Sequence, residues 1–447
     1  MSEQALEKTM GDTGMAQKKT ARSALFEDRN FRWMMAGGVI SMLGDQFTLI
    51  ALPWLVLQMT GDTLILGAVL ALIGVPRAVF ILLGGALVDR YSPKKVLMWT
   101  KHVNTVLLGL LALLVLSNTL QLWMVYALAL GLGFSTAFSI PSGSAMLPRV
   151  VAGPLLQPAN GILLGVRQLT MFAGPLLAGL LIALFGDGGQ GAVSSAKGLG
   201  AAFLFDACSF ALSAWTLSKV SLRTLPAADA KSLGHKPKLL QAVVQGLRYC
   251  WNDKELRTCF LYWAAIAFFI SGPIQVAMPV LAGRIHGGAA ALGMLAGAHG
   301  AGTLLGMALS GIKPRLRLGS LGGTILLVDA VVGILFIPLG LINSTWQGSA
   351  ILLAIGILGG FLHVAVFTWM QRRVPPEMIG RTMSIFMFIF MGIAPLSAAV
   401  TGWVMRNLQV AQVFAASGAM LIVIVLCALL ASPMRRVQDM QGQAGAR

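Results

Sequence analysis

Seven of the ionisable residues inside the long apolar stretches of this 447-residue chain are of types and at depths that could do chemistry. They are Asp45, Arg77, Arg167, Asp206, His299, Asp329 and His363. A charge inside an apolar stretch of membrane length is costly, so such residues mark ion, proton or substrate pathways by default. A carboxylate or an imidazole there can take up and release a proton, and an arginine can hold an anion. The residue types therefore indicate binding and proton transfer.

Asp45 is the first candidate for a site that binds a proton or a cationic group. It lies near the middle of the first apolar stretch, with Ser41 and Thr48 at helical spacing on the same face. A structural alternative is open. In it, Asp45 stays ionised and pairs with Arg77 on the next stretch, which holds two helices in register. The two roles are compatible if proton binding breaks the pair.

Arg167 and His363 complete the candidates for proton coupling or substrate binding. Arg167 is expected to line the interior, since facing lipid would be expensive, and both substrate or counter-ion contact and a structural role are open for it. His363 and His299 can titrate near neutral pH, although a lone His is more often a hydrogen-bonded packing residue. Asp206 and Asp329 lie in the sixth and ninth stretches, and structural pairing is the role favoured for them by the family resemblance given below.

A soft apolar face is predicted in the eleventh stretch. Thioether and aromatic side chains suit varied amphiphilic ligands, so the residues on this face are cavity candidates. A lipid-facing or packing stripe explains the same spacing equally well. The residues are Met383, Phe386, Met387, Phe390 and Met391.

Motifs for covalent or metal chemistry do not occur in the sequence. It holds no His-Glu-x-x-His and no Gly-x-Ser-x-Gly, and its four cysteines form no Cys-x-x-Cys pair. We therefore expect that the chain is not an enzyme and that it uses no metal and no cofactor. A proton gradient is the expected driving force.

A short, densely charged turn at residues 84–97 joins the second and third apolar stretches. Its glycines permit close approach of two helices, and Pro93 prevents the preceding helix from continuing. Its basic residues are expected to keep the turn in the cytoplasm, because Lys and Arg near span ends set orientation. The candidate gating motif consists of Gly85, Asp89, Arg90, Lys94 and Lys95.

This turn resembles the loop between the second and third helices of the major facilitator superfamily, roughly Gly-x-Leu-Ala-Asp-Arg-x-Gly-Arg-Lys-x-x-Leu. Ser92 and Pro93 replace the usual Gly and Arg. The order of Leu43-Gly44-Asp45, Met146-Leu147-Pro148-Arg149 and Gly174-Pro175 further resembles the macrolide-efflux and enterobactin-exporter-like drug:proton antiporter branch. The turn itself matches the pattern at Gly85, Leu87, Asp89, Arg90, Lys94 and Leu97.

The resemblance implies an all-α integral membrane protein, with twelve transmembrane helices in two pseudo-repeated six-helix bundles. It also implies proton-coupled export of a small amphipathic drug, siderophore or metabolite by alternating access. The alternative is an uncoupled lysophospholipid or lipid transporter, or flippase. Many drug:proton antiporters of the superfamily carry an Arg in the fourth helix, which the stretch from Leu122 to Pro141 lacks. Coupling must then rest on Asp45 with Arg77 or Arg167, or be missing.

Composition places the chain in a membrane, because 57% of its residues are hydrophobic and 11% are charged, against about 25% charged in soluble proteins. When a Lys or Arg within five residues of a span end is counted with that end, 28 of the 33 Lys and Arg fall on one side, three on the other and two deeper inside the spans given below. This asymmetry predicts a multi-pass protein of the inner cell membrane with both termini cytoplasmic. The net charge of +17 does not indicate nucleic-acid binding, since no basic stripe alternates with stacking aromatics.

Twelve stretches are long and apolar enough to span a bilayer. They lie at about 33–58, 65–88, 96–117, 121–142, 158–185, 200–219, 258–282, 289–311, 320–342, 348–370, 380–404 and 410–432. Weak echoes at an offset of about 220 residues, such as Gly174-Pro175-Leu176 and Ala394-Pro395-Leu396, relate two halves. The predicted domains are a cytoplasmic tail at 1–28, bundles at 29–219 and 258–432, a cytoplasmic linker at 220–257 and a cytoplasmic tail at 433–447.

The linker at 220–257 is predicted to contain an amphipathic helix. Its apolar residues recur at helical spacing, and they include Val244, Leu247 and Trp251. A helix on the inner membrane surface and a packed linker helix both fit this pattern. The expected partners of the whole chain are a small amphipathic substrate and membrane lipids, with the chain acting as a monomer.

Overall fold

The computed structural model describes residues 23–185, 192–223, 239–285, 287–313, 316 and 319–437. All regular elements within these ranges are helices, and twelve of them are long and apolar enough to cross a membrane. The predicted all-α class with twelve spans is therefore confirmed. Residues 1–22 and 438–447 of the predicted tails lie outside the described residues, and so do residues 224–238 of the predicted linker.

Six spans form the first part of the chain. Asp28 caps the first of them by accepting from the backbone N–H groups of Asn30 and Phe31, and Gly61 ends it in the left-handed conformation at φ 63°. Pro93 begins the third span, as its lack of an N–H group favours. The helices are α2 (Arg29–Thr60), α3 (Thr63–Arg90), α4 (Pro93–Leu116), α5 (Leu122–Val150), α6 (Leu156–Phe185) and α7 (Ala192–Ser218), with the 3-10 turn η1 (Gly153–Leu155) before α6.

The second part begins with α9 (Leu239–Asn252) and also contains six spans. Its first span runs over Lys254–Arg284 and includes a π-helical turn at Pro273, where proline removes a regular helical hydrogen bond. The elements are α10 (Lys254–Gly272), η2 (Pro273–Ala277), α11 (Met278–Arg284), α12 (Gly288–Ile312), α13 (Leu321–Leu339), α14 (Thr345–Arg373), α15 (Pro376–Val404), α16 (Val410–Ala431) and η3 (Pro433–Arg436).

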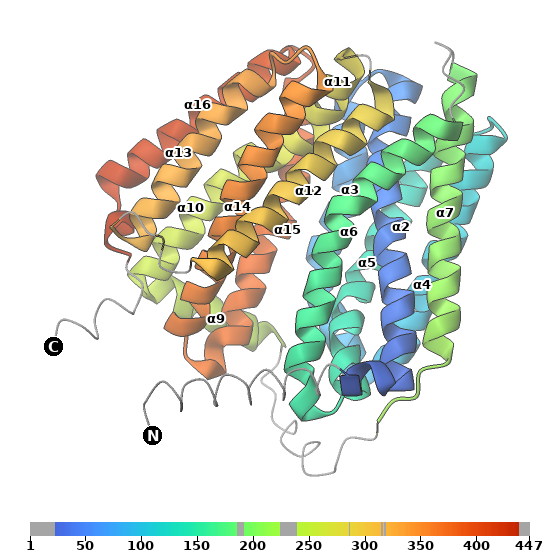
Figure 1. The fold of residues 1–447 in the computed structure, drawn as a ribbon, viewed down its shortest axis with the longest axis horizontal. Coiled ribbons are helices and arrows are strands. Elements are labelled where there is room, and N and C mark those ends of the chain that lie inside the picture. Colours follow the sequence, from blue (N-terminus) through green and yellow to red (C-terminus); the bar gives the residue numbers. More distant parts are fainter. Residues whose placement is uncertain are drawn as a thin grey trace, which may run out of the picture.

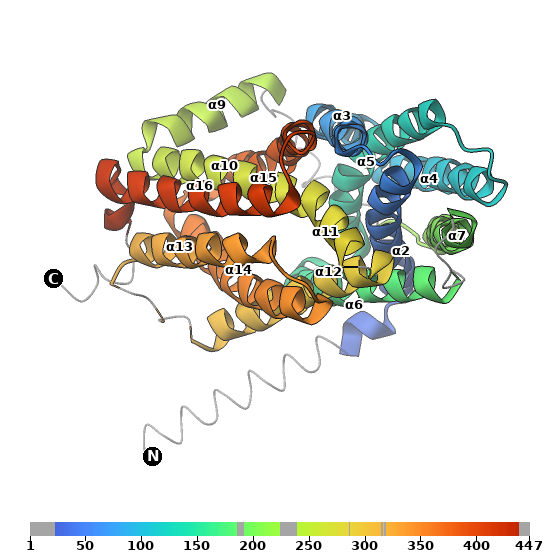
Figure 2. The same ribbon diagram turned by 90° about the horizontal axis from the view of Figure 1, so that it is seen from above.

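The spans gather into two groups that stand side by side (Figures 1 and 2). Helices α2 to α7 pack on one another, and α10 to α16 pack on one another. We propose that these groups are the two bundles predicted at 29–219 and 258–432. Below, the proximal end of the molecule is the end with the start of α2 and the end of α16. The distal end is the opposite one, with the connections at 61–62, 117–121 and 405–409.

Small residues bring the two groups together in the distal half of the molecule. Helix α3 packs on α15 and α6 packs on α12. A Cβ added at Gly67 would lie 2.7 Å from the carbonyl oxygen of Ala398, and one added at Gly293 would lie 2.9 Å from the Cα of Gly179. Contacts this short leave no room for a side chain, so glycine is what allows the distal half to close.

Two polar contacts across the groups add to this closure. Arg406 Nη2 contacts Asp62 Oδ2 at 2.6 Å, and Thr63 Oγ1 donates to the carbonyl oxygen of Gly402 at 3.0 Å. The hydrogen bond from Arg406 lowers the pKa of Asp62 below its ordinary value. We call this ion pair the distal latch.

Open space surrounds several glycines in the proximal halves of the helices that border the other group. A Cβ added at Gly143 of α5, Gly161 or Gly165 of α6, or Gly380 of α15 would meet nothing within 4 Å. The tight glycine contacts between the groups named here thus lie in the distal half, and these proximal glycines make none.

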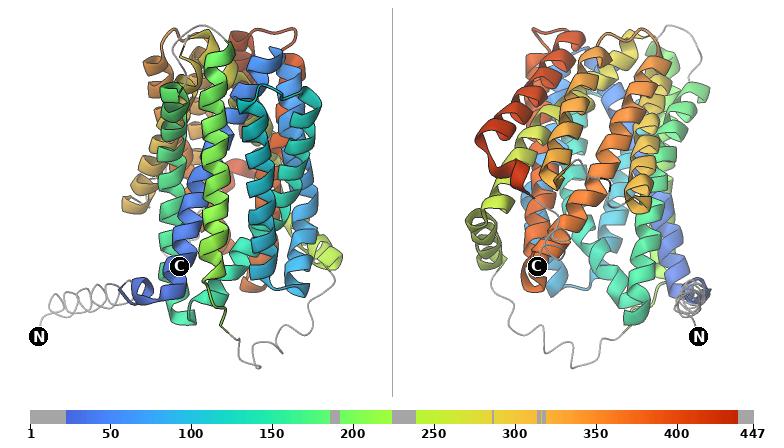
Figure 3. Two further views of the ribbon diagram at one scale, coloured as in Figure 1. Left: turned by 90° about the vertical axis from the view of Figure 1, so that its right-hand side faces the viewer. Right: turned by 60° about the vertical axis from the view of Figure 1, so that its left-hand side comes forward.

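Helix α9 lies beside α10 and α15 at the edge of the bundle (Figures 2 and 3). One side packs on α15, where Gly246 meets Arg381 and Cys250 Sγ lies 3.8 Å from Thr382 Oγ1. Lipid contact through the opposite side stays a prediction, and the apolar side chains exposed there are Val244, Leu247 and Trp251.

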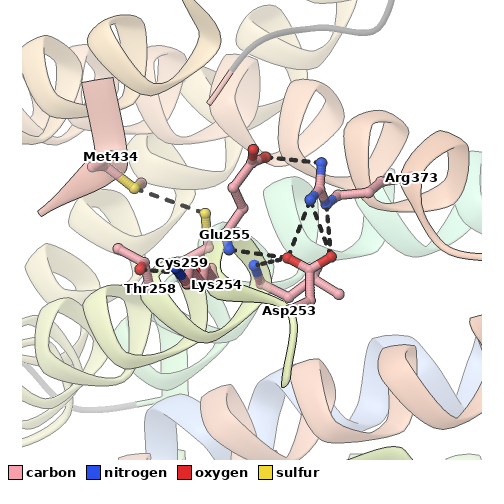
Figure 4. A network of polar contacts seen from close by, with 8 residues as sticks. Asp253, Lys254, Glu255, Thr258, Cys259, Arg373 and Met434 are labelled. Atoms are coloured by element: carbon pink, nitrogen blue, oxygen red, sulfur yellow. Dashed lines mark hydrogen bonds and ion pairs between the residues drawn. The ribbon is translucent and has the colours of Figure 1, made fainter. Parts of the chain in front are cut away.

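An ionic network fixes the junction between α9 and α10 against the end of α14 (Figure 4). Arg373 makes ion pairs with Asp253 at 3.0 Å and with Glu255 at 2.9 Å. Asp253 also caps α10 by accepting from the N–H groups of Glu255 and Leu256. Helix α9 and the junction that follows it are therefore in contact with both α14 and α15.

Candidate transport site

Asp45 lies at the midpoint of the 32-residue helix α2. Its side chain is exposed, although its helix neighbours Gly44 and Phe47 are buried. The cations whose charges act on it are Lys101 of α4 and Arg77 of α3, so Asp45 faces the interior between these helices. In the described part of the chain no ion pair as close as 4 Å joins Asp45 to either cation.

Lys101 is buried between α2, α4 and α7. Its Nζ donates to Ser41 Oγ at 2.7 Å and lies 4.7 Å from the centre of the Phe210 ring. The negative charges that act on it are those of Asp45 and Asp206. A cation at this depth thus contacts one hydroxyl and one aromatic face, and the charges of two carboxylates act on it without a direct ion pair.

Asp206 of α7 is also buried, with 1% of its surface exposed. Thr48 donates to its Oδ2, and Ser209 Oγ lies 3.2 Å from its Oδ1. Gly44 lets α7 approach, because a Cβ there would lie 2.8 Å from Ser209 Cβ. Asp45, Lys101 and Asp206, with their hydroxyl partners, form one polar cluster inside the first group, which we call the α2–α4–α7 cluster.

Arg77 lies about one helical turn beyond Gly74 of α3, toward the proximal end. Gly74 makes a tight contact with Pro395 of α15, and a Cβ there would lie 2.7 Å from the Cβ of that proline. The Nε of Arg77 is buried without a hydrogen-bond partner. The structure therefore brings Arg77 and Asp45 together as charged neighbours without joining them in the ion pair that the structural alternative requires.

Arg167 occupies the equivalent place on α6, one turn from Met171 toward the proximal end. Met171 packs on Gly300 of α12, and a Cβ at Gly300 would lie 2.6 Å from the Met171 carbonyl oxygen. The Arg167 side chain is exposed. Its positive charge acts on His363 of α14, which is also exposed and whose ring stacks on Phe367 with centroids 6.1 Å apart.

The predicted soft face of α15 divides between core and surface. Phe386 is buried against Trp263 of α10, with ring centroids 5.5 Å apart, and Met383 packs on the same core. Met387 and Phe390 are each 41% exposed, and Met391 is partly buried. The structure brings only part of the predicted set to an accessible surface.

Comparison with known proteins now adds to this geometry. The sequence profile of the Major Facilitator Superfamily matches residues 34–399. The chain belongs to the Major Facilitator Superfamily. The enterobactin exporter EntS of Salmonella choleraesuis (strain SC-B67) is 26% identical over 356 residues, covering 78% of this chain and 80% of the relative. EntS of Shigella boydii serotype 4 (strain Sb227) is 25% identical over 418 residues, covering 93% of this chain and 95% of that protein.

A solved structure of the nucleoside transporter NupG has the same fold. It superposes with a TM-score of 0.66 at 14% identity and covers 89% of this chain and 98% of NupG. As a Major Facilitator Superfamily member with twelve apolar helices, the protein is a multi-pass inner-membrane transporter. Its relatives carry small molecules and are not enzymes.

The candidate gating motif of this superfamily member is described only in part. The side chains of Gly85, Asp89 and Arg90 lie outside the described residues. Lys94 Nζ donates to the carbonyl oxygens of Ser218 and Val220, at 3.1 and 2.6 Å, so it ties the start of α4 to the end of α7 within one group. Lys95 is exposed.

The sequence analysis missed Lys101. It was counted among the basic residues of the cytoplasmic side, but it lies eight residues after the start of α4, about 12 Å along the helix axis. The signal was available, because a helix that begins at a proline after a charged turn carries its first two turns into the bundle. The predicted span 96–117 already contained Lys101, five residues after its start, and the residue was assigned to the cytoplasmic end of that span.

A second buried polar pair lies at the same register in the other group. Tyr262 of α10 donates to Asp329 Oδ2 of α13 at 2.7 Å. Asp329 is eight residues after the start of α13, as Lys101 is after the start of α4, and each contacts the first span of its own group. Lys101 and Asp329 thus occupy related positions in the two groups, and each makes a buried polar contact with the first span of its group. The contact in the first group involves a cation on which two carboxylates act, whereas the contact described in the second group joins a tyrosine and an aspartate. His299 of α12 is exposed.

Proposed function

We propose that this protein is a proton-coupled exporter, which moves a small amphipathic compound out of the cell by alternating access. The observation that carries the proposal is Asp45, an exposed carboxylate at mid-span beneath a closed distal end. A carboxylate at that depth is expensive unless it is used. Two cations act on it without fixing it in an ion pair, so its charge is free to change.

Alternating access is supported by the way the two groups meet. They touch through glycines in the distal half, whereas glycines of α5, α6 and α15 in the proximal half face open space. The excess of Lys and Arg favours the cytoplasm as the side of the proximal end. On this orientation the structure represents a state open to the cytoplasm and closed to the outside, from which a compound would be loaded for export.

Coupling would work through charge balance at the α2–α4–α7 cluster. When Asp45 gives up a proton, it adds a negative charge beside Lys101 and Arg77. When Asp45 takes up a proton, the negative charge that acts on Lys101 and Arg77 disappears, and the attraction of these two cations to other groups then decides their positions. Because Arg77 lies one turn from the contact between Gly74 and Pro395, such a change acts next to the closed interface. Two relatives named as exporters support outward transport.

An uncoupled lysophospholipid transporter or flippase is the second candidate. The observation that favours it is the group of large apolar side chains exposed on α15, at Met387, Phe388 and Phe390. A flexible apolar surface suits acyl chains. This candidate gives no role to Asp45, which is the point at which the two candidates differ.

The test is transport in proteoliposomes, with and without an imposed pH gradient, using a panel of amphipathic drugs and a lysophospholipid. Wild type should concentrate at least one drug when the gradient is imposed. Asp45→Asn should abolish this concentration but keep passive equilibration, and Asp45→Glu should retain part of it. Glu27→Gln removes an exposed carboxylate at the proximal end and serves as the control. Concentration by Asp45→Asn under a pH gradient alone would show that Asp45 is not the coupling residue.

A further inference from the structure

Arg167 is a cation at membrane depth without a counter-charge of its own. Within the described residues it makes no hydrogen bond and no ion pair, and its side chain is exposed. Arg77 differs, because the carboxylate of Asp45 acts on it. Lys101 differs as well, because both Asp45 and Asp206 act on it. Of these three cations of the first group, Arg167 is the one for which no carboxylate is found.

The second group supplies no acid to this place. The described parts of α12 and α14, at 288–312 and 345–373, contain no Asp or Glu, and in α15 such a residue occurs only in the first turn, at Glu377. Asp329 of α13 is buried and accepts from Tyr262, so it is not available. The charge of Arg167 acts on His363, whose imidazole carries no negative charge and so cannot serve as its counter-ion.

Arg167 and His363 lie on opposite groups just below the closed interface. On α6, Arg167 is one turn from Met171, which packs on Gly300 of α12. On α14, His363 is one turn from Gly360, which packs on Thr303, one turn beyond Gly300. Arg167 therefore lies about one turn, and His363 about two turns, on the proximal side of the contact between Met171 and Gly300, which is the tight contact between the groups in this part of the interface.

We propose that Arg167 and His363 form an anion subsite, which holds the carboxylate, sulfonate, phenolate or phosphate group of an amphipathic substrate. The proposal rests on the proposed function, in that it assigns a substrate class to the same transport site. A guanidinium presents a planar set of donors that suits oxyanions. His363 would donate a further hydrogen bond, and Phe367 beside its ring offers an aromatic surface to the apolar body.

The position of the subsite gives it a mechanical consequence. An anion bound there contacts α6 of one group and α14 of the other, so it holds the two groups together below the distal contact. Loading an anion would therefore favour closure of the proximal side, which is the step an exporter needs after it has taken up its cargo. Without an anion, no hydrogen bond or ion pair of Arg167 or His363 joins the two groups within the described residues.

The experiment measures equilibrium binding to the purified full-length protein in detergent, with radiolabelled 2-naphthoate as the probe and no proton gradient. Wild type should bind 2-naphthoate at least about tenfold more tightly than the uncharged 2-naphthamide. Arg167→Gln should weaken 2-naphthoate binding by about 10-fold to 100-fold, as loss of a charged hydrogen bond does. Arg167→Lys should restore part of it, and His363→Gln should cost less. Arg435→Gln removes one exposed cation outside the site and should leave 2-naphthoate binding unchanged.

Competition distinguishes the source of the anion. Displacement of 2-naphthoate by lysophosphatidylglycerol and not by lysophosphatidylcholine would assign the subsite to an anionic lipid headgroup. Displacement by neither would assign it to a soluble organic anion. Equal displacement by both lipids, equal affinity for 2-naphthoate and 2-naphthamide, or unchanged 2-naphthoate binding in Arg167→Gln would overturn the anion subsite.

Failure of this proposal is separable from failure of proton coupling. The binding assay uses no gradient, and Asp45→Asn is expected to keep 2-naphthoate binding. If wild type bound 2-naphthoate and 2-naphthamide with equal affinity, the anion subsite would be refuted and the proposed role of Asp45 in transport would be unaffected. Thermal unfolding of Arg167→Gln and Arg167→Lys checks that both variants fold. If both are as stable as wild type, a 2-naphthoate affinity that is weakest in Arg167→Gln and intermediate in Arg167→Lys is not expected from a merely structural role of Arg167.

Discussion

Gly300→Ala should shift the protein away from its distally closed state. A Cβ added at Gly300 of α12 would lie 2.6 Å from the carbonyl oxygen of Met171 and 2.9 Å from the Cα of Phe172, both backbone atoms of α6. Because these atoms cannot rotate away as a side chain can, α6 or α12 must retreat. Overpacking of this kind costs about 1–3 kcal/mol. The cost applies only when the two groups touch, so the ratio of closed to open molecules should fall about 5-fold to 150-fold.

Distances between spin labels at the distal end measure this shift. Trp123 at the start of α5 and Trp346 at the start of α14 are exposed and belong to different groups, so both positions accept a labelled cysteine. The four native cysteines are replaced beforehand. In Gly300→Ala, the share of molecules with the longer distance between labels should rise.

Two control variants separate closure from general destabilisation. In Gly356→Ala the added Cβ would lie 2.9 Å from the backbone N of Thr303, but this contact joins α14 and α12 within one group. It should lower the unfolding temperature and leave the label distance unchanged. Gly109→Ala meets nothing within 4 Å and should do neither. If Gly300→Ala behaves like Gly356→Ala, the contact between α6 and α12 does not move during the cycle and the reasoning fails.

Three further predictions follow from named contacts. Since the hydrogen bond from Arg406 lowers the pKa of Asp62 below 3.8, the distal latch is present above that pH and is lost as the pH at the distal end falls through the lowered value. The same label distances should therefore not change between about pH 6 and 8, whereas Asp62→Asn should lengthen them at every pH in that range. Lys101→Met leaves two carboxylates of the α2–α4–α7 cluster without their buried cation, so it should lower the unfolding temperature, and adding Asp206→Asn should recover at least about half of the loss; additive losses would show that Lys101 and Asp206 are not coupled. An impermeant thiol reagent applied to intact cells should label Asp62→Cys and not Arg435→Cys, and labelling of Arg435→Cys alone would reverse the orientation.

The fold could be predicted from the sequence because a bilayer requires long apolar helices, and twelve such stretches are visible in the chain. Turns that separate spans carry local signals, such as Pro93 at the start of α4 and Gly61 at the end of α2. The π-helical turn at Pro273 was not predicted, because prolines inside membrane helices often produce only a kink.

The site could be predicted as a set of residues but not as an arrangement. Apolar context identifies Asp45, Arg77 and Arg167 as costly, yet it does not say which of them are neighbours. The partner of Lys101 is Ser41, a residue 60 positions earlier in the chain, and that contact depends on how α2 and α4 pack. Phe386 and Met387 are adjacent in sequence, but one is buried and the other is exposed because α10 covers only one side of α15.

The most direct test of the central claim, that Asp45 couples compound movement to protons, measures the protons themselves. Proteoliposomes are loaded with a compound found in the transport assay and a pH-sensitive dye, and are diluted into compound-free buffer with no imposed pH gradient. Coupling is reciprocal, so efflux of the compound through wild type should acidify the lumen, and Asp45→Asn should release the compound without acidification. Equal acidification by wild type and Asp45→Asn, or release by wild type with no pH change, would contradict the account.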